Sequence, residues 1–542
     1  MRSVMSHQFS QVPKAKIQRS SFNRDHGHKT TLDAGYLVPV YVDEALPGDT
    51  FNLSLHAVAR MNAALKPPMD NLSLSSFFFA VPIRLLWGNW QRFNGERDNP
   101  ADSVDFTIPQ MVTTAAYSAG SLHDYFGLPL YSAAPGVSHS SLWHRAYNLI
   151  YNEWFRDQNI QDSVVVDVDD GPDAPADYVL LRRGKRHDYF TSCLPWPQKG
   201  DSVDLPLGTS APVSLVSTFT QQPVIRRTSD HALAIGEGNL IANAGTATLH
   251  TTTSGYDAVL DPAGSLFADL STATAATINQ LRQAFQVQRL YERDARGGTR
   301  YTEIVRSHFG VTSPDARLQR PEYLGGGVTP VSFGSALNTN ALTLSSVSGF
   351  ASSAPFLGVQ SGFGHVSVAG HGFSKSFTEH CVLIGLVCVD ADLTYQYGIN
   401  RMFSRSTRWD FYWPALAQIG EQAVPTKELW CVAPATDTGA TGTPDNDKVF
   451  GYQERFAEYR YKPSLVTGLF RSNAPSTLDV WHLSQKFTSL PTLSPSFIVS
   501  DPPIDRIIAV PSEPHFIFDS FFQLRCARPM PIFGVPGMID HF

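Results

Sequence analysis

The chain has 542 residues, of which 42% are hydrophobic, and only 17% are charged, below the roughly 25% usual in soluble domains. Its 42 Lys+Arg and 49 Asp+Glu residues give a formal net charge of −7. This balance excludes a disordered chain, a strongly basic protein and a small disulfide-stabilised scaffold. The low charge also suggests that other chains cover much of the surface.

Targeting and redox signals point to a reducing compartment. Residues 1–11 lack the apolar core of a secretory signal, and the longest apolar run, near residues 381–389, is far shorter than the ~20 residues of a membrane span. The cysteines are odd in number and form no CxxC pair, so we expect buried, reduced thiols. They are Cys193, Cys381, Cys388, Cys431 and Cys526.

The first 30 residues are basic. They contain six Lys and Arg residues against Asp25 alone, a net charge of +5, which leaves −12 for residues 31–542. The segment is polar and has no hydrophobic periodicity, so it predicts an extended basic arm. The alternative is a frayed terminus whose charge is incidental.

The next part of the chain combines strands with one helix. Alternating apolar and polar residues predict strands at 51–58 and 72–81, separated by a turn at Pro67. Helical spacing of apolar residues predicts a helix over Ser141–Asp157. Two basic and aromatic segments, Tyr178–Arg183 and Tyr189–Leu194, are predicted as short strands.

The composition changes at residues 200–277. This segment holds 20 Ser and Thr residues, three aromatic residues and a net charge of −5, and it keeps short β-like runs such as Ser214–Thr220. It predicts a structured, solvent-facing insertion. A broad apolar face then predicts a helix over Ala276–Arg293, followed by a shorter helix over Thr299–Phe309.

A second unusual segment, residues 323–374, has no charged residue at all. We expect extended packing in an interface between subunits, and the alternative is a buried internal loop layer. Strands are predicted again at Val382–Tyr397, Val449–Tyr461 and Phe516–Arg525. Strands along the whole length, with helices only in the connections, favour an antiparallel β architecture with long loops.

Enzyme and metal signatures are missing. No GxxxxGK[ST], GxGxxG after a strand, GxSxG or HExxH motif occurs. Residues 167–171 resemble a calcium loop only superficially, and a solvated acidic turn is favoured. His365, His371 and His380 would bind zinc only if folding brought them together, so strand or loop histidines are favoured. We predict no catalytic residue, no metal and no cofactor.

A diffuse nucleic-acid signal remains. The basic arm and residues 84–97 interleave cations with aromatic rings, a combination suited to sequence-tolerant binding of single strands. The alternative at 84–97 is that Trp87 and Trp90 fill the core. The candidate DNA-contacting residues are Arg2, Lys14, Lys16, Arg19, Arg24, Lys29, Arg84, Trp87 and Arg92.

Several long strings resemble segments of the gokushovirus (Microviridae) major capsid protein. They begin with AYNLIYNEWFR at 146–156 and SCLPWPQKG at 192–200. They continue with YERDARGGTRY at 291–301 and GVTSPDARLQRPEY at 310–323. The tail, RPMPIFGVPGMIDHF at 528–542, is similar to the ending of that family. The likeness spans the chain from about residue 20 to its end, apart from 200–277 and 323–374.

The resemblance implies a fold and a function. The fold would be mainly β, an eight-stranded antiparallel jelly roll of the viral capsid type with large loop insertions and a few short helices. Sixty copies would self-assemble into a T=1 icosahedral shell around the circular single-stranded DNA genome of a tailless bacteriophage. A small basic DNA-packaging protein would be a further partner. The chain would belong to the virion and assemble in the cytoplasm of the bacterial host.

The expected domain organisation follows from both lines of reasoning. Residues 1–30 form the basic arm, 31–199 the first part of the jelly-roll core, and 278–542 its second part. Residues 200–277 form a surface insertion, a candidate for the protrusion at the threefold axes and for contact with a host receptor. The alternatives are a β-sandwich adhesin or carbohydrate-binding module with residues 200–277 as its contact surface and, less favoured, a β-rich hydrolase.

Overall fold

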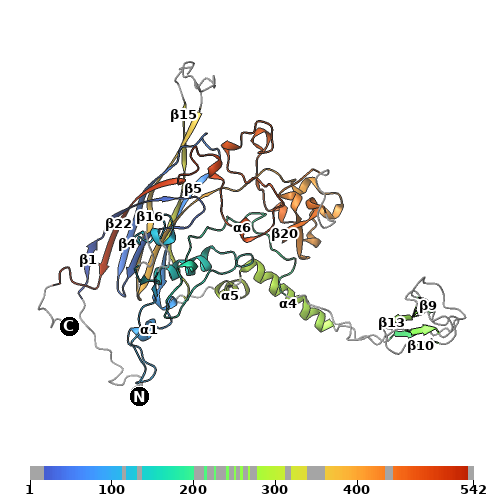
Figure 1. Ribbon diagram of the computed structural model, residues 1–542, viewed down its shortest axis with the longest axis horizontal. Helices are drawn as coiled ribbons and strands as arrows, with labels where there is room; N and C mark the ends of the chain where they lie inside the picture. The colour runs from blue at the N-terminus through green and yellow to red at the C-terminus, as the bar shows by residue number, and fades with distance from the viewer. Residues whose placement is uncertain are drawn as a thin grey trace. The chain divides into compact units, whose positions relative to one another are not determined.

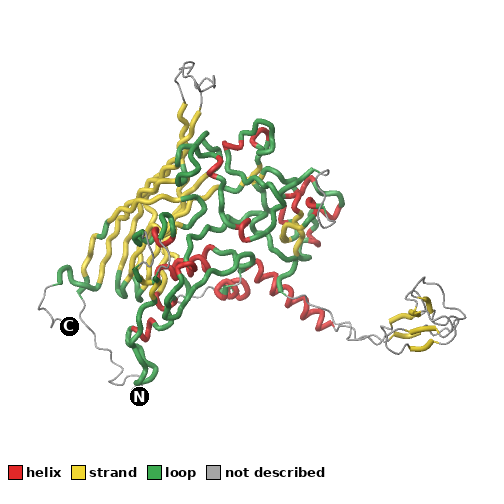
Figure 2. Tube along the Cα trace, in the orientation of Figure 1, coloured by secondary structure: helices red, strands yellow, loops and turns green. Residues whose placement is uncertain are grey.

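The computed structural model of the chain describes most of its length (Figure 1). The described ranges are 18–112, 117–130, 137–200, 278–298, 300–311, 319–337, 360–433 and 444–534, together with six short strands between residues 213 and 268. Two compact units are present: residues 1–197 with 311–542, and residues 198–310. The larger unit is mainly β, and its strands, yellow in Figure 2, gather into antiparallel sheets. This confirms the predicted antiparallel β class.

One sheet has six strands in the order β1-β22-β4-β16-β15, with β2 also paired to β22. All of its pairings are antiparallel. It consists of β1 (Ser20–Asn23), β2 (His26–Leu32), β4 (Thr50–Met61), β15 (Ser332–Leu337), β16 (Gln360–Ser376) and β22 (Phe516–Arg528).

The second sheet has four strands in the order β14-β5-β17-β3, and these pairings are also antiparallel. Its strands are β3 (Val38–Ala45), β5 (Leu72–Pro82), β14 (Glu322–Pro330) and β17 (Cys381–Ala391). Strands β4, β5 and β22 confirm the strands that apolar patterning predicts. Strand β17 confirms the first part of the strand predicted at Val382–Tyr397 but ends at Ala391.

The main core lies between the two sheets. Buried and exposed residues alternate along β4 and β22, because one face of each strand points into the core and the other points away. Aromatic rings from opposite sheets meet there: the ring centroids of Tyr41 and Phe522 are 5.3 Å apart, and those of Phe78 and Phe373 are 5.7 Å apart. Each fully buried side chain of this size contributes roughly 1.5–3 kcal/mol.

The uncharged segment 323–374 belongs to these sheets where it is described. Strands β14 and β15 and most of β16 come from it, and they pair with β5, β4 and each other within the chain. In these parts the segment is therefore not a buried loop layer. Its strands pair with other strands of the same chain. Its expected role between subunits stays a prediction, and residues 338–359 lie outside the described residues.

A layer of short helices and loops covers the other face of the four-stranded sheet. It includes α1 (Trp90–Phe93), α2 (Leu122–Tyr125) and α3 (Leu142–Ile150), which continues as a π-helical turn over Tyr151–Phe155. The helix predicted over Ser141–Asp157 is thus confirmed, although only Leu142–Ile150 is α-helical. Leu142, Ala146 and Ile150 pack against Val382 and Ile384 of β17, so all eleven residues of β17 are buried.

The connection between β17 and β22 is largely irregular. It contains β18 (Thr394–Tyr395), β19 (Glu421–Pro425), β20 (Val449–Glu454), β21 (Ser464–Leu465), α6 (Pro495–Ile498) and several 3-10 turns. Strand β20 is shorter than the strand predicted at 449–461. Tyr189, Phe190 and Cys193 pack with residues of this connection in a separate small core.

The strands predicted at Tyr178–Arg183 and Tyr189–Leu194 are wrong. Each segment makes only isolated bridges, Tyr36 with Arg182 and Leu194 with Tyr452. Side chains hold these segments instead: the Tyr178 hydroxyl donates to Asp173 at 2.7 Å. Buried aromatic rings therefore produce an alternating pattern there without a sheet.

The described part of the smaller unit contains the helices α4 (Ile278–Gly297) and α5 (Tyr301–Phe309), which confirm the helices predicted at 276–293 and 299–309. His308 Nε2 lies 2.6 Å from the Asp294 carboxylate and joins the two. The strands of this unit are β8 (Val213–Leu215), β9 (Ile225–Arg227), β10 (Leu240–Ala242), β11 (Leu249–Thr251), β12 (Asp257–Leu260) and β13 (Leu266–Ala268).

An ion pair in the helical layer provides a test of the fold. Arg145 and Asp173 are both buried, with Arg145 Nε 2.7 Å from Asp173 Oδ2, and Arg145 also donates to the Leu86 carbonyl at 3.0 Å. We expect Arg145→Met to lower the free energy of unfolding by about 3–5 kcal/mol, because Asp173 would remain buried without its cation. Chemical denaturation of the unassembled subunit measures this. Asp169→Asn, which loses only the exposed partner, should cost less than about 1 kcal/mol.

Two buried histidines in the same layer predict a pH dependence. His123 Nδ1 and His144 Nε2 are 2.9 Å apart, and burial lowers the pKa of His144 and lowers that of His123 to about 4. The unfolded chain binds protons at these sites below about pH 6.5 while the folded chain does not, so stability should fall as pH drops from about 6.5 to 4. Melting temperatures across this range should depend less on pH in His144→Gln, whereas exposed His187→Gln should behave as the wild type.

Candidate functional site

Part of the predicted basic arm belongs to the six-stranded sheet. Residues 20–23 and 26–32 form β1 and β2 and pair with β22 near the other end of the chain. Only the segment before Ser20 can therefore act as an arm. Arg2, Lys14 and Lys16 belong to that segment and lie outside the described residues.

The three described cations of this region differ in how far their side chains are already paired within the protein. Arg19 donates to the Thr50 hydroxyl at 2.6 Å. Arg24 makes two hydrogen bonds to the Asp43 carboxylate, at 2.7 and 2.9 Å, so its charge is already neutralised. Lys29 is 80% exposed and lies 3.4 Å from Asp519. Arg19 and Lys29 are the better placed of the three to reach a phosphate.

The candidates in residues 84–97 are held by the protein. Arg84 Nε donates to Glu379 at 2.7 Å, and Arg92 lies 3.3 Å from Asp98. Trp87 is fully buried, and its indole N–H donates to Asp170 at 2.6 Å. Its ring faces are covered by the core, so Trp87 cannot stack on a base in this fold. The alternative interpretation, that it fills the core, is the one that the structure supports.

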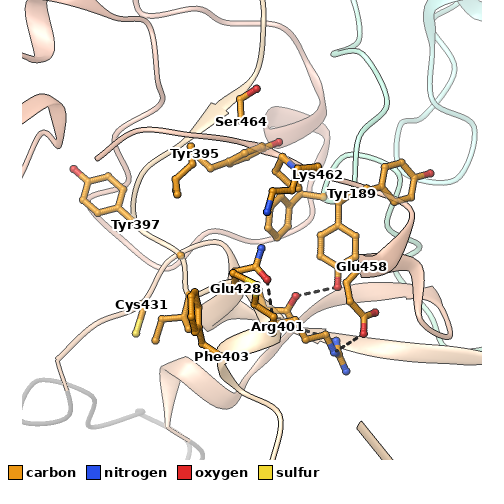
Figure 3. A pocket seen from close by; sticks show the side chains of 18 of the residues that line it. Tyr189, Tyr395, Tyr397, Arg401, Phe403, Glu428, Cys431, Glu458, Lys462 and Ser464 are labelled. Carbon is orange, nitrogen blue, oxygen red and sulfur yellow. Dashed lines mark hydrogen bonds and ion pairs between the residues drawn. The ribbon is translucent and has the colours of Figure 1, made fainter. Parts of the chain in front are cut away.

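A pocket of about 490 Å³ opens in the larger unit, in the connection between β17 and β22 (Figure 3). The pocket is lined by Tyr189, Phe190 and residues from 395–403, 428–431 and 458–473, several of which Figure 3 labels. Its aromatic walls are Tyr189, Phe190, Tyr395, Tyr397, Phe403 and Tyr461.

A network of paired charges lines one side of this pocket. Arg401 lies 2.9 Å from Glu428 and 3.9 Å from Glu458, and the Tyr189 hydroxyl donates to Glu428 at 2.9 Å. Burial raises the pKa of Glu428 to about 7 even though the Arg401 charge opposes the shift. Near neutral pH this carboxyl group can therefore donate or accept a hydrogen bond. Aromatic faces beside such groups suit a polar molecule with a flat apolar side.

Sequence reasoning missed this pocket. Its key groups, Tyr189, Arg401, Glu428 and Glu458, are far apart in the chain and occur in no local motif. The aromatic residues of Tyr189–Leu194 predict a strand there and give no sign of a pocket. No pairing of a nucleophile with a base appears in the network, which consists of carboxylates held by an arginine and a tyrosine.

The cysteines and histidines have structural surroundings. All five cysteines are free thiols, and four of them are buried as predicted, whereas Cys431 is only half-buried. His371 contacts the Ser76 hydroxyl at 2.8 Å and the Thr329 hydroxyl at 3.1 Å. In the described part of the chain, no three His, Cys, Asp or Glu side chains converge as metal ligands. No helix there has the length and apolar character that a membrane span requires.

Comparison with known proteins places the chain in a family. The family model described as "Capsid protein (F protein)" matches residues 10–538. The capsid protein VP1 of Bdellovibrio phage phiMH2K is 44% identical, over 99% of this chain and 98% of its own length. Capsid protein VP1 of Chlamydia phage 1 is 42% identical over the same shares, and that of Spiroplasma virus 4 is 33% identical over 98% and 97%.

These matches run through both sheets and all the connections between them. They confirm the resemblance to gokushovirus major capsid proteins that the strings at 146–156 and 528–542 indicate. The chain therefore belongs to the phage capsid protein (F protein) family and is a structural protein of the Microviridae type.

Proposed function

We propose that this chain is a major capsid protein whose sixty copies assemble into a T=1 shell around a circular single-stranded DNA genome. The observation that carries the proposal is the family match over almost the full length, joined to the order of the strands. Assembly in the cytoplasm of a bacterial host, with the finished chain in the virion, is part of the proposal.

The strand order supports an eight-stranded jelly roll. Numbered along the chain, β2, β3, β4, β5, β14, β16, β17 and β22 give the orders 1-8-3-6 in one sheet and 2-7-4-5 in the other. Successive strands alternate between sheets except where β5 pairs with β14, as two nested Greek keys require. In this scheme β1 and β15 are additions at the edges. The segments 83–321 and 392–515 are large insertions that would build the contacts between subunits.

The distribution of charge supports contact with DNA at the N-terminal end. The +5 of residues 1–30 contrasts with −12 in the rest of the chain. Four of these cations, Arg2, Lys14, Lys16 and Arg19, precede the first strand, and phosphates would bind them in a salt-dependent way. A small basic packaging protein is proposed to share this task.

The smaller unit supports the proposal of a surface protrusion. Residues 198–310 form a compact unit of their own, and the Ser- and Thr-rich segment 200–277 lies within it. A polar, acidic segment such as 200–277 is suited to solvent, and we place it at the threefold axes as a candidate contact with the host cell.

A carbohydrate-binding module is the second candidate function, and the pocket beside Tyr189 and Glu428 favours it. Tyrosine faces with hydrogen-bonding carboxyl groups match the apolar and hydroxyl faces of a sugar. Sizing the purified protein separates the two, because a capsid protein should give megadalton particles and a binding module a monomer or small oligomer.

Removing the arm charges should reduce DNA content without blocking assembly. The triple variant Lys14→Ala, Lys16→Ala, Arg19→Ala has fewer cations to neutralise phosphates. Its purified particles should therefore retain less DNA and lose it at a lower salt concentration. The ratio of absorbance at 260 and 280 nm across a salt series measures this.

The matched control for the arm removes three cations from ion pairs of the 392–515 connection: Lys427→Ala, Lys448→Ala, Arg460→Ala. Its particles should retain DNA as the wild type does. Equal DNA content in the two variants would refute the role of the arm.

Imaging tests the protrusion. A cryo-electron microscopy map of purified particles should place residues 200–277 outside the shell at the threefold axes, and a variant lacking 203–275 should lose that density. Density for this segment on the inner surface would contradict the proposal.

A further inference from the structure

Five aromatic side chains form an exposed surface in the connection between β17 and β22. Their exposed fractions are all close to one half, between 48% and 52%. We call this set the aromatic surface, and it consists of Trp409, Phe411, Tyr412, Trp413 and Tyr459. An apolar area of this kind is unusual on a chain that stays alone in water.

Contacts join these side chains in two groups that are neighbours along residues 408–413. The ring centroids of Tyr412 and Tyr459 are 6.2 Å apart, and the Arg405 guanidinium lies 4.3 Å from the Tyr459 centroid and 5.4 Å from that of Phe411. The Trp413 indole N–H donates to the Arg408 carbonyl at 2.9 Å, and the Arg408 guanidinium stacks on Trp409 at 4.0 Å.

The backbone beneath this surface is fixed. The Asp410 carboxylate accepts hydrogen bonds from the backbone N–H groups of Ser406 and Thr407, at 3.0 and 2.7 Å, which closes the 3-10 turn at 408–410. Arg405, which is nearly buried, anchors the segment to Glu458 at 3.3 Å. Binding to a preformed surface costs less conformational entropy than binding that must first order a loop.

The charges near the surface favour a protein over DNA as its partner. The charged residues near the surface are Arg405, Arg408, Arg455, Asp410 and Glu458, which together carry a net charge of +1. Arg405 is already paired with Glu458. Tight binding of a DNA backbone uses several free cations. The surface instead has the composition of a protein interface core, which is rich in Trp, Tyr, Phe and Arg and poor in Lys.

We propose that the aromatic surface is a contact between copies of this chain, closed in the assembled shell whether or not DNA is inside. The inference rests on the proposed capsid function, because a shell subunit meets other copies of itself over large interfaces. The low charge of the whole chain, 17%, agrees with subunit contacts that cover such surfaces.

Hydroxyl-radical footprinting with mass spectrometry tests this on three samples: unassembled subunits, empty shells and DNA-filled particles. Oxidation of Trp409 and Trp413 should fall at least about fivefold from subunits to empty shells, because half-exposed rings become buried in an interface core. Filled particles should show the same protection. Buried Trp87 should react weakly in all three samples.

Each other outcome overturns the inference in a distinct way. Protection only in filled particles would assign the surface to DNA, and protection already in free subunits would mean that the chain covers it by itself. Equal, high reactivity in all samples would show that nothing covers it. If no particles form from the wild-type chain, the proposed capsid function fails, and the inference fails with it.

A pair of variants gives a second measurement. The double variant Phe411→Ser, Tyr412→Ser should reduce the yield of particles at least about tenfold, because two interface anchors are lost. The melting temperature of its unassembled subunit should equal that of the wild type. Phe411→Leu, Tyr412→Phe keeps the apolar area and should assemble. Normal assembly of the serine variant would contradict the proposal.

Discussion

The structure depends on one strand, β17, which is buried on both faces. It lies between β5 and β3, its inner face meets the core between the sheets, and its outer face meets α3. Gly385 marks how closely this strand is packed, because a Cβ there would lie 2.7 Å from the Phe78 ring and 2.9 Å from the Tyr41 Cβ. The strand therefore joins three layers, and each insertion of the chain begins from a sheet that β17 holds in place.

The long connections between the strands hold the features that a simple β-sandwich lacks, namely the covering layer and the pocket. Arg145 and Asp173 fix the covering layer from inside, and Arg401 with Glu428 and Glu458 fixes the pocket region in the same manner. In both places an arginine, buried at 145 and partly buried at 401, links loops through ion pairs with carboxylates. Such loops can then present rigid surfaces, including the one around Trp409, without belonging to a sheet.

Much of the fold could be predicted from the sequence, and the exceptions have physical reasons. Alternation revealed β4 and β22 because one face of each strand is buried, and the apolar face of α4 revealed that helix. Strand β2 was missed because Leu32 is its only buried residue, so an edge strand looked like a polar arm. The pocket could not be predicted, since Tyr189, Arg401 and Glu428 meet only through tertiary packing.

The position of β22 has a consequence for the order of events during synthesis. This strand ends at Arg528, yet it lies between β4 and the two N-terminal strands β1 and β2, and its register spans Met61 to Thr50. Until the ribosome has added β22, β4 has one open edge, and β1 and β2 have no strand to pair with. The six-stranded sheet therefore closes only after β22 has been synthesised, later than every other strand of the two sheets.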